Sequence, residues 1–289
     1  MSTRIRRGIV AASAIAGVVA SLVVGLAGES AAKSYGLRAF GITSDGKLMA
    51  QFGTNKPQEL DWVRAVSGLS GDVSLIGLDF RVQNNTLYGV GNAGGIYTIS
   101  IPDVVVKKVS QLGVALDGGF FGVDFNPAAN RLRVVSNTGQ NLRHNIDDGP
   151  TAGTTVVDQP LSTPPAPAPT PGVSAVAYTN NDLNADTATT LFDINTTTDQ
   201  VVVQSPANNG TLAPTGALGV DAGPNAGLDI FSDLSGGKTV AMSAFATLVP
   251  NGGSGPATLY SVNLLTGAAA GLGQFPLAIT DIAVALDTN

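Results

Sequence analysis

The chain has 289 residues, of which 44% are hydrophobic and only 12% are charged, and it contains 36 glycines. This composition is typical of many short strands joined by tight turns, and it excludes an intrinsically disordered chain. The chain has no cysteine, so core packing rather than disulfides must hold it together, and its net charge of −6 argues against nucleic acid and anionic lipid as partners.

The N-terminal segment has the pattern of an export signal. Three arginines precede an uncharged run over residues 8–28, and small residues occupy positions 30 and 32. This pattern predicts a signal peptide over residues 1–32 that is cleaved after Ala32, or an uncleaved N-terminal anchor; the general secretory and twin-arginine routes both remain open. We therefore expect a bacterial protein that is secreted, periplasmic or part of the cell envelope. Removal of this segment, which holds three Arg and one Glu, leaves a net charge of −8.

A five-residue motif recurs along the rest of the chain. It reads IGLDF, FGVDF and AGLDI at residues 76–80, 121–125 and 226–230, with weaker copies, SAVAY and AITDI, at residues 174–178 and 278–282. Successive copies are separated by 45, 53, 52 and 52 residues. A repeat of about 50 residues made of short strands indicates radial repetition, and it predicts an all-β protein with the β-propeller fold.

Three further strands are predicted between successive copies of the motif. In the second unit they cover residues 87–90, 95–99 and 104–109, so that each unit has four strands. The chain ends are different, because residues 37–68 have room for three strands but no motif, and the last motif has no strands after it. If the C-terminal strand pairs with the N-terminal blade, both segments are completed and no sheet edge stays open. The sequence thus predicts a single five-bladed domain over residues 33–289.

The motif also indicates where its strand lies. Alternate residues of a strand point to opposite faces, so the Gly and the Asp of the motif share one face and its large apolar residues share the other. A small residue beside a carboxylate suits the innermost strand of a blade, where neighbouring backbones approach closely.

A proline-rich stretch separates the third and fourth units. It has six prolines within residues 159–172. Because proline cannot donate a hydrogen bond to a sheet, we predict an extended surface loop that acts as a spacer.

Four of the five motif copies carry an aspartate at the same position, namely Asp79, Asp124, Asp229 and Asp281, and the fifth has Ala177. If these strands line the central channel, the carboxylates form a ring that can bind a cation. Alternatively, each aspartate accepts hydrogen bonds from backbone N–H groups of the adjoining turn. The repetition favours the structural interpretation, because active sites usually break the symmetry of a repeat.

A second candidate metal site has the ligand spacing of an EF-hand calcium loop. The residues concerned are Asp182, Asn184, Asp186 and Asp193. Alternating oxygen ligands of this kind can wrap one Ca²⁺, which is the only cofactor that the sequence suggests. The position that requires glycine in such a loop is Thr187, so a solvated Asn/Asp turn is the favoured interpretation.

The chain has one histidine, His144, so any Ser-His-Asp triad would depend on it. There is no G-x-S-x-G motif to supply the serine. Because Arg143 and Asn145 flank it, we predict His144 to be a polar surface residue. Residues 235–239 resemble the end of a phosphate-binding loop, but they join two predicted strands, so we expect a hairpin turn there.

Several segments resemble the bacterial domain-of-unknown-function 4394 family. The segments are residues 122–136, 138–143, 177–181, 190–194, 210–212 and 216–221. The resemblance implies an exported, propeller-like domain, and it transfers no catalytic residue. The proline-rich insertion and His144 depart from the family pattern.

Together these features favour a non-enzymatic binding or cell-surface module that recognises an extracellular ligand or surface partner. One alternative is a metal-dependent, lactonase-like hydrolase that uses the channel carboxylates. Another is a structural component of the envelope or matrix. No nucleic acid is expected as a partner, and no membrane contact is expected beyond the N-terminal anchor.

Overall fold

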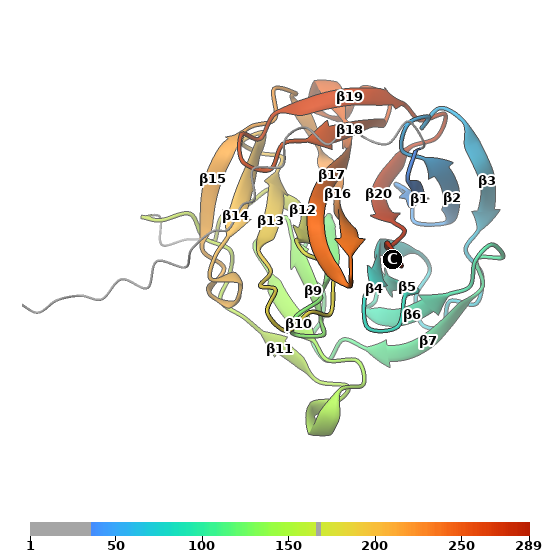
Figure 1. The fold of residues 1–289 in the computed structure, drawn as a ribbon, viewed down its shortest axis with the longest axis vertical. Coiled ribbons are helices and arrows are strands. Elements are labelled where there is room, and N and C mark those ends of the chain that lie inside the picture. The colour runs from blue at the N-terminus through green and yellow to red at the C-terminus, as the bar shows by residue number, and fades with distance from the viewer. Residues whose placement is uncertain (1–35, 166–168) are drawn as a thin grey trace, which may run out of the picture.

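The computed structural model describes residues 36–165 and 169–289, so the predicted export segment, residues 1–32, lies outside the described residues. Five four-stranded antiparallel sheets surround a central axis as the blades of a β-propeller (Figure 1). The predicted fold class and the predicted number of blades are therefore confirmed. In the part of the chain that the structure describes, no helix has the length and apolar character needed to cross a membrane.

The strands of each blade are given from the innermost to the outermost. The first blade contains β20 (Ile279–Val284), β1 (Arg38–Thr43), β2 (Leu48–Gly53) and β3 (Leu60–Ala65). The second contains β4 (Leu75–Arg81), β5 (Thr86–Gly91), β6 (Gly95–Ile99) and β7 (Val106–Gln111). The third contains β8 (Phe121–Asn126), β9 (Arg131–Ser136), β10 (Asn141–His144) and β11 (Thr155–Val157).

The last two blades follow the same order. The fourth contains β12 (Val173–Tyr178), β13 (Leu191–Asn195), β14 (Gln200–Gln204) and β15 (Leu212–Ala217). The fifth contains β16 (Ala222–Ser235), β17 (Lys238–Val249), β18 (Thr258–Val262) and β19 (Ala269–Gln274). Short helical turns are η1 (Gly149–Thr151), η2 (Ala207–Asn209) and α1 (Pro250–Gly253).

The ring is closed by strands from the two ends of the chain. The C-terminal strand β20 lies beside β1 (Figure 1). The two strands pair in an antiparallel register that places Phe40 opposite Ala283. The predicted closure is thus confirmed. Because β20 supplies the innermost strand of the first blade, that blade has four strands like the other four.

The motif strands β4, β8, β12, β16 and β20 are the innermost strands, and they pack against one another around the axis. The motif glycines face the next inner strand closely. A Cβ atom on Gly122 would lie 2.7 Å from the backbone nitrogen of Val176, and one on Gly227 would lie 2.7 Å from the Cα atom of Asp281. Only glycine fits at these two positions without a shift of the neighbouring backbone.

The hydrophobic core is divided into five clusters, one at each contact between adjacent blades. Between the first two blades the rings of Phe40 and Phe80 lie 5.7 Å apart, and between the second and third blades those of Tyr88 and Phe125 lie 5.2 Å apart. Burial of apolar side chains between the blades is the main force that stabilises the ring.

Two predicted loops differ in how closely they match the sequence-based expectation. The turn between β16 and β17 is a two-residue hairpin in which Gly236 and Gly237 both have positive φ, as predicted for residues 235–239. The proline-rich segment is more than a surface spacer, because Leu161 is fully buried and Ser162 exchanges backbone hydrogen bonds with Gly210 and Leu212. Its first half is therefore fixed between the third and fourth blades.

Candidate functional site

The structure brings three of the four repeat aspartates together on the axis of the propeller. One carboxylate oxygen from each of Asp79, Asp124 and Asp229 lies within 4.8 Å of the others. These residues belong to β4, β8 and β16, so three different blades contribute. Each of the three is at most 5% exposed, and Asp281 on β20 is 6% exposed.

Each repeat carboxylate accepts a hydrogen bond from the inner strand of the next blade. The N–H of Leu78 donates to Asp281 at 2.8 Å, and the N–H of Phe125 donates to Asp79 at 2.7 Å. The other two carboxylates do the same: Asp124 accepts a hydrogen bond from the backbone of Tyr178, and Asp229 accepts one from the N–H of Val284. The predicted role as an acceptor of backbone hydrogen bonds is present, but the donors lie in the neighbouring blade and, for Asp79 and Asp229, also in the next residue of the same strand, and not in the adjoining turn.

Burial of these carboxyl groups raises their pKa values. The pKa values of Asp79, Asp124 and Asp281 lie well above the ordinary range, first because the groups are removed from water and second because neighbouring carboxylates repel a further negative charge. For Asp229, burial raises the pKa to about 6. The cluster therefore keeps its negative charge only where another charge or a set of donors compensates it.

The fourth blade has Ala177 at the aspartate position and makes its contact to the fifth blade differently. The side-chain amide of Asn181 donates to the carbonyl of Ile230 at 3.0 Å, and the backbone N–H of Asn181 donates to the hydroxyl of Ser232 at 2.9 Å. The fourth and fifth blades are therefore joined by polar contacts of Asn181 instead of by a carboxylate on the axis.

The predicted calcium loop is not assembled. Asp182 accepts hydrogen bonds from the backbone and the hydroxyl of Thr239, and Asn184 accepts one from the N–H of Asp186. Asp193 lies elsewhere, within β13, where it is fully buried. Among the described residues, the only acidic side chains that lie close enough together to share one ion are those on the axis.

The sequence analysis considered Asp193 as a ligand in a calcium loop, but in the structure it is a buried carboxyl group within a strand. Neither of its oxygens has a hydrogen-bond partner, and burial raises its pKa well above the usual range, against the opposing effect of the Arg133 charge. A strand of apolar residues on either side, Leu191 to Ile194, is the signal that places this position in a core rather than in a loop.

The prediction that His144 is a surface residue is wrong. His144 is fully buried in β10, and its two ring nitrogens lie 2.8 Å from the hydroxyl of Ser110 and 2.9 Å from that of Thr155. Burial lowers the pKa of His144 to about 4, so the ring is neutral at pH 7. The alternation of β10, in which His144 shares a face with the buried Leu142, was the signal in the sequence.

A buried ion cluster was not predicted from the sequence. Asp158 accepts hydrogen bonds from the guanidinium groups of Arg133 and Arg143, at 2.6 Å from Arg133 and 2.8 Å from Arg143 Nη2. Arg133 also donates to Asn208 in η2, which belongs to the fourth blade. The cluster therefore connects two blades, and no local pattern marks Asp158 as its centre.

A small cavity lies at one mouth of the channel. It has a volume of about 270 Å³ and is lined by residues at or beyond the C-terminal ends of four inner strands, among them Val82, Leu183, Leu234 and Leu286. Figure 1 places the C-terminus near the centre of the ring, in agreement with the position of residues 286–289 in this lining. The side chain of Leu183 is 61% exposed, so an apolar residue faces solvent at the mouth.

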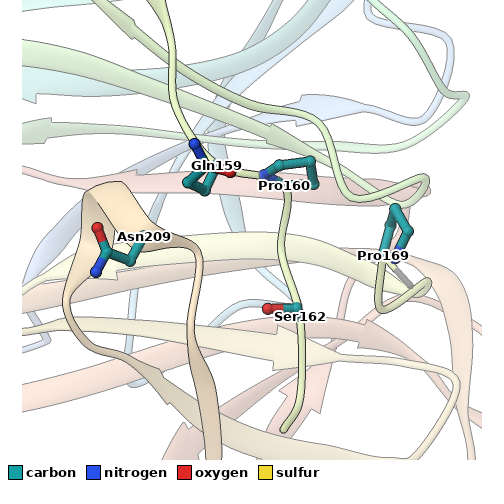
Figure 2. A pocket seen from close by; sticks show the side chains of 5 residues that line it. All are labelled: Gln159, Pro160, Ser162, Pro169 and Asn209. Atoms are coloured by element: carbon teal, nitrogen blue, oxygen red, sulfur yellow. The ribbon is translucent and has the colours of Figure 1, made fainter. Parts of the chain in front are cut away.

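A second hollow, of about 200 Å³, lies beside the proline-rich segment. Figure 2 shows Gln159, Pro160 and Ser162 along one stretch of chain, with Asn209 on one side of it and Pro169 on the other. None of the described residues that line it is charged.

The fold and the axial carboxylates define a five-bladed β-propeller with a buried acidic centre. The chain belongs to the family described as Domain of unknown function (DUF4394), whose model matches residues 48–283. No curated protein matches the chain in sequence.

Solved structures with a similar arrangement of strands are distant in sequence. Glutaminyl cyclase from Myxococcus xanthus has 13% identity and a TM-score of 0.44, with coverage of 74% of this chain and 90% of the other. An auxiliary nutrient binding protein from Bacteroides thetaiotaomicron has 10% identity and a TM-score of 0.42, with coverage of 88% and 68%. A putative 6-phosphogluconolactonase from Bacteroides uniformis has 16% identity and a TM-score of 0.34, with coverage of 78% and 63%.

Proposed function

We propose that this protein is an exported, non-enzymatic binding module whose ligand or surface partner contacts the loops at the channel mouth. The observation that carries the proposal is the cavity there, to which loops of several blades contribute together with the C-terminal segment. Propellers and other rigid scaffolds commonly present their binding residues on such loops. The exposed Leu183 adds apolar surface that a ligand can cover.

The burial of the reactive side chains supports binding over hydrolysis. A general acid or base must come within hydrogen-bond reach of the substrate. The four repeat aspartates are at most 6% exposed, and both ring nitrogens of His144 are already engaged by hydroxyl groups. These observations disfavour the metal-dependent, lactonase-like hydrolase, and no feature of the described residues favours a purely structural envelope component.

Export is part of the proposal and rests on residues 1–32 alone. Expression of the full chain in a bacterial host, followed by intact-mass measurement of the extracytoplasmic protein, tests it. We expect a mature N-terminus at Lys33. Recovery of the uncleaved chain in the cytoplasm alone would contradict this part of the proposal.

Binding can be tested with two variants whose substituted residues are equally exposed but lie at different places on the protein. Leu183 at the mouth and Val157 on the outer strand β11 are both 61% exposed. The parent, Leu183→Arg and Val157→Arg are compared by thermal shift and calorimetry against a panel of saccharides and short peptides. We expect a ligand that stabilises the parent and Val157→Arg but not Leu183→Arg. Turnover of an ester, lactone or glycoside that Asp124→Asn abolishes would replace the binding proposal with the hydrolase.

A further inference from the structure

The three carboxylates on the axis lack a visible counter-charge. The ion pairs among the described residues use the acids Glu59, Asp147, Asp148 and Asp158, and none of them involves a repeat aspartate. The backbone N–H groups that donate to the cluster stabilise it, but they carry only partial charges. Three buried carboxylates within 4.8 Å of one another therefore require a further positive charge if they are ionised.

One oxygen of the cluster is also left without a partner. Asp79 and Asp229 each use both carboxylate oxygens to accept backbone hydrogen bonds. Asp124 differs, because its Oδ1 atom is buried and has no hydrogen-bond partner. The charges that act most strongly on Asp124 are those of Asp79 and Asp229. A buried acceptor beside two other carboxylates is thus available to a ligand.

The ligand set fits one particular class of ion. Oxygen atoms of Asp79, Asp124 and Asp229 lie within 4.8 Å of one another, close enough to share one ion. Ca²⁺ accepts irregular sets of carboxylate oxygens, whereas Mg²⁺ requires a near-ideal octahedral arrangement. Zinc is disfavoured, because the chain has no cysteine and its single histidine lies in β10.

We propose that Asp79, Asp124 and Asp229 bind one Ca²⁺ on the axis of the propeller, where the ion links the second, third and fifth blades. The ion has a structural role, because its ligands are buried on the innermost strands, where a substrate could not reach the ion. The site is separate from the channel-mouth cavity and does not depend on the binding role proposed above.

The test uses the whole purified protein, unfolded and refolded in chelator so that a trapped ion is removed. Thermal unfolding is then measured with CaCl₂, with MgCl₂ and with chelator alone, and bound metal is counted by elemental analysis. We expect about one Ca²⁺ per chain and a rise in Tm of about 5 °C or more in CaCl₂. An unchanged Tm in CaCl₂ and chelator, or a response to MgCl₂ alone, would overturn the proposal.

Two variants locate the site. Asp124→Asn keeps an acceptor oxygen for the backbone of Tyr178 and removes one negative charge, so we expect it to lose the calcium response and to be more stable than the parent in chelator. Asp182→Asn, in the loop once expected to bind calcium, is the control and should respond like the parent. A response that survives in Asp124→Asn or disappears in Asp182→Asn contradicts the axial site. If Asp124→Asn does not fold, the parent measurements still decide.

Discussion

The carboxylate of Asp79 in β4 accepts a hydrogen bond of 2.7 Å from the backbone N–H of Phe125 in β8, although the two residues belong to different blades. Asp281 and Leu78 repeat this relation between the first and second blades. A side chain on one inner strand therefore satisfies the backbone of the next. The contact between blades is specified by polar groups as well as by the apolar clusters, and this arrangement has consequences that mutations can measure.

Deletion of residues 278–289 should abolish cooperative unfolding. The deletion removes β20, which leaves β1 without its inner partner and Leu78 without the carboxylate of Asp281. Circular dichroism melting and light scattering are the measurements, with deletion of residues 288–289 as the control that keeps β20. A truncated protein that melts at the parent temperature without aggregation would show that closure is not required.

Gly122→Ala should destabilise the protein by about 1–3 kcal/mol, as overpacking of a tight contact does. The added Cβ would lie 2.7 Å from the backbone nitrogen of Val176. Gly119→Ala is a matched control three residues away, because a Cβ there has no neighbour within 4 Å. Urea unfolding of the two variants should therefore differ. Equal midpoints would contradict the close approach of the inner strands.

His144→Ala should lower the free energy of unfolding by about 1–3 kcal/mol, because it removes two buried hydrogen bonds and leaves a cavity. Ser110 belongs to the second blade and Thr155 to the third, so His144 connects the blades. The control is Lys107→Ala, at an exposed position of β7, the strand that contains Ser110, and it should change stability little. The measurement is the free energy of unfolding and not an activity. A variant as stable as the parent would restore the surface interpretation of this residue.

The pH dependence of stability should include a contribution from His144. Its pKa is about 4 in the folded protein and about 6.5 in the unfolded chain, so between these values the unfolded state binds the proton. This contribution is fully present above about pH 6.5 and is lost as the pH falls towards about 4. Between pH 7 and pH 4 the parent should therefore lose more stability than His144→Ala. Parallel urea-unfolding profiles for the two proteins would exclude the titration.

The repeat alone determined the architecture. Motif spacing, the shared face of Gly122 and Asp124, and the unmatched segments at the two chain ends are patterns within the sequence, and a closed ring of four-stranded blades is the arrangement that accommodates them. These patterns are local or periodic, and strand geometry converts them directly into structure.

Only the tertiary structure decided the partners of the polar side chains. One of the two donors to Asp79 is 46 residues away. Asp193 lies in a strand and not in a calcium loop, and His144 is buried by contacts with Ser110 and Thr155. The polar neighbours Arg143 and Asn145 suggested exposure for His144, but packing between blades buries it. The physical reason is that such contacts form between strands distant in sequence, so their geometry depends on how the blades stack and not on the residues beside them.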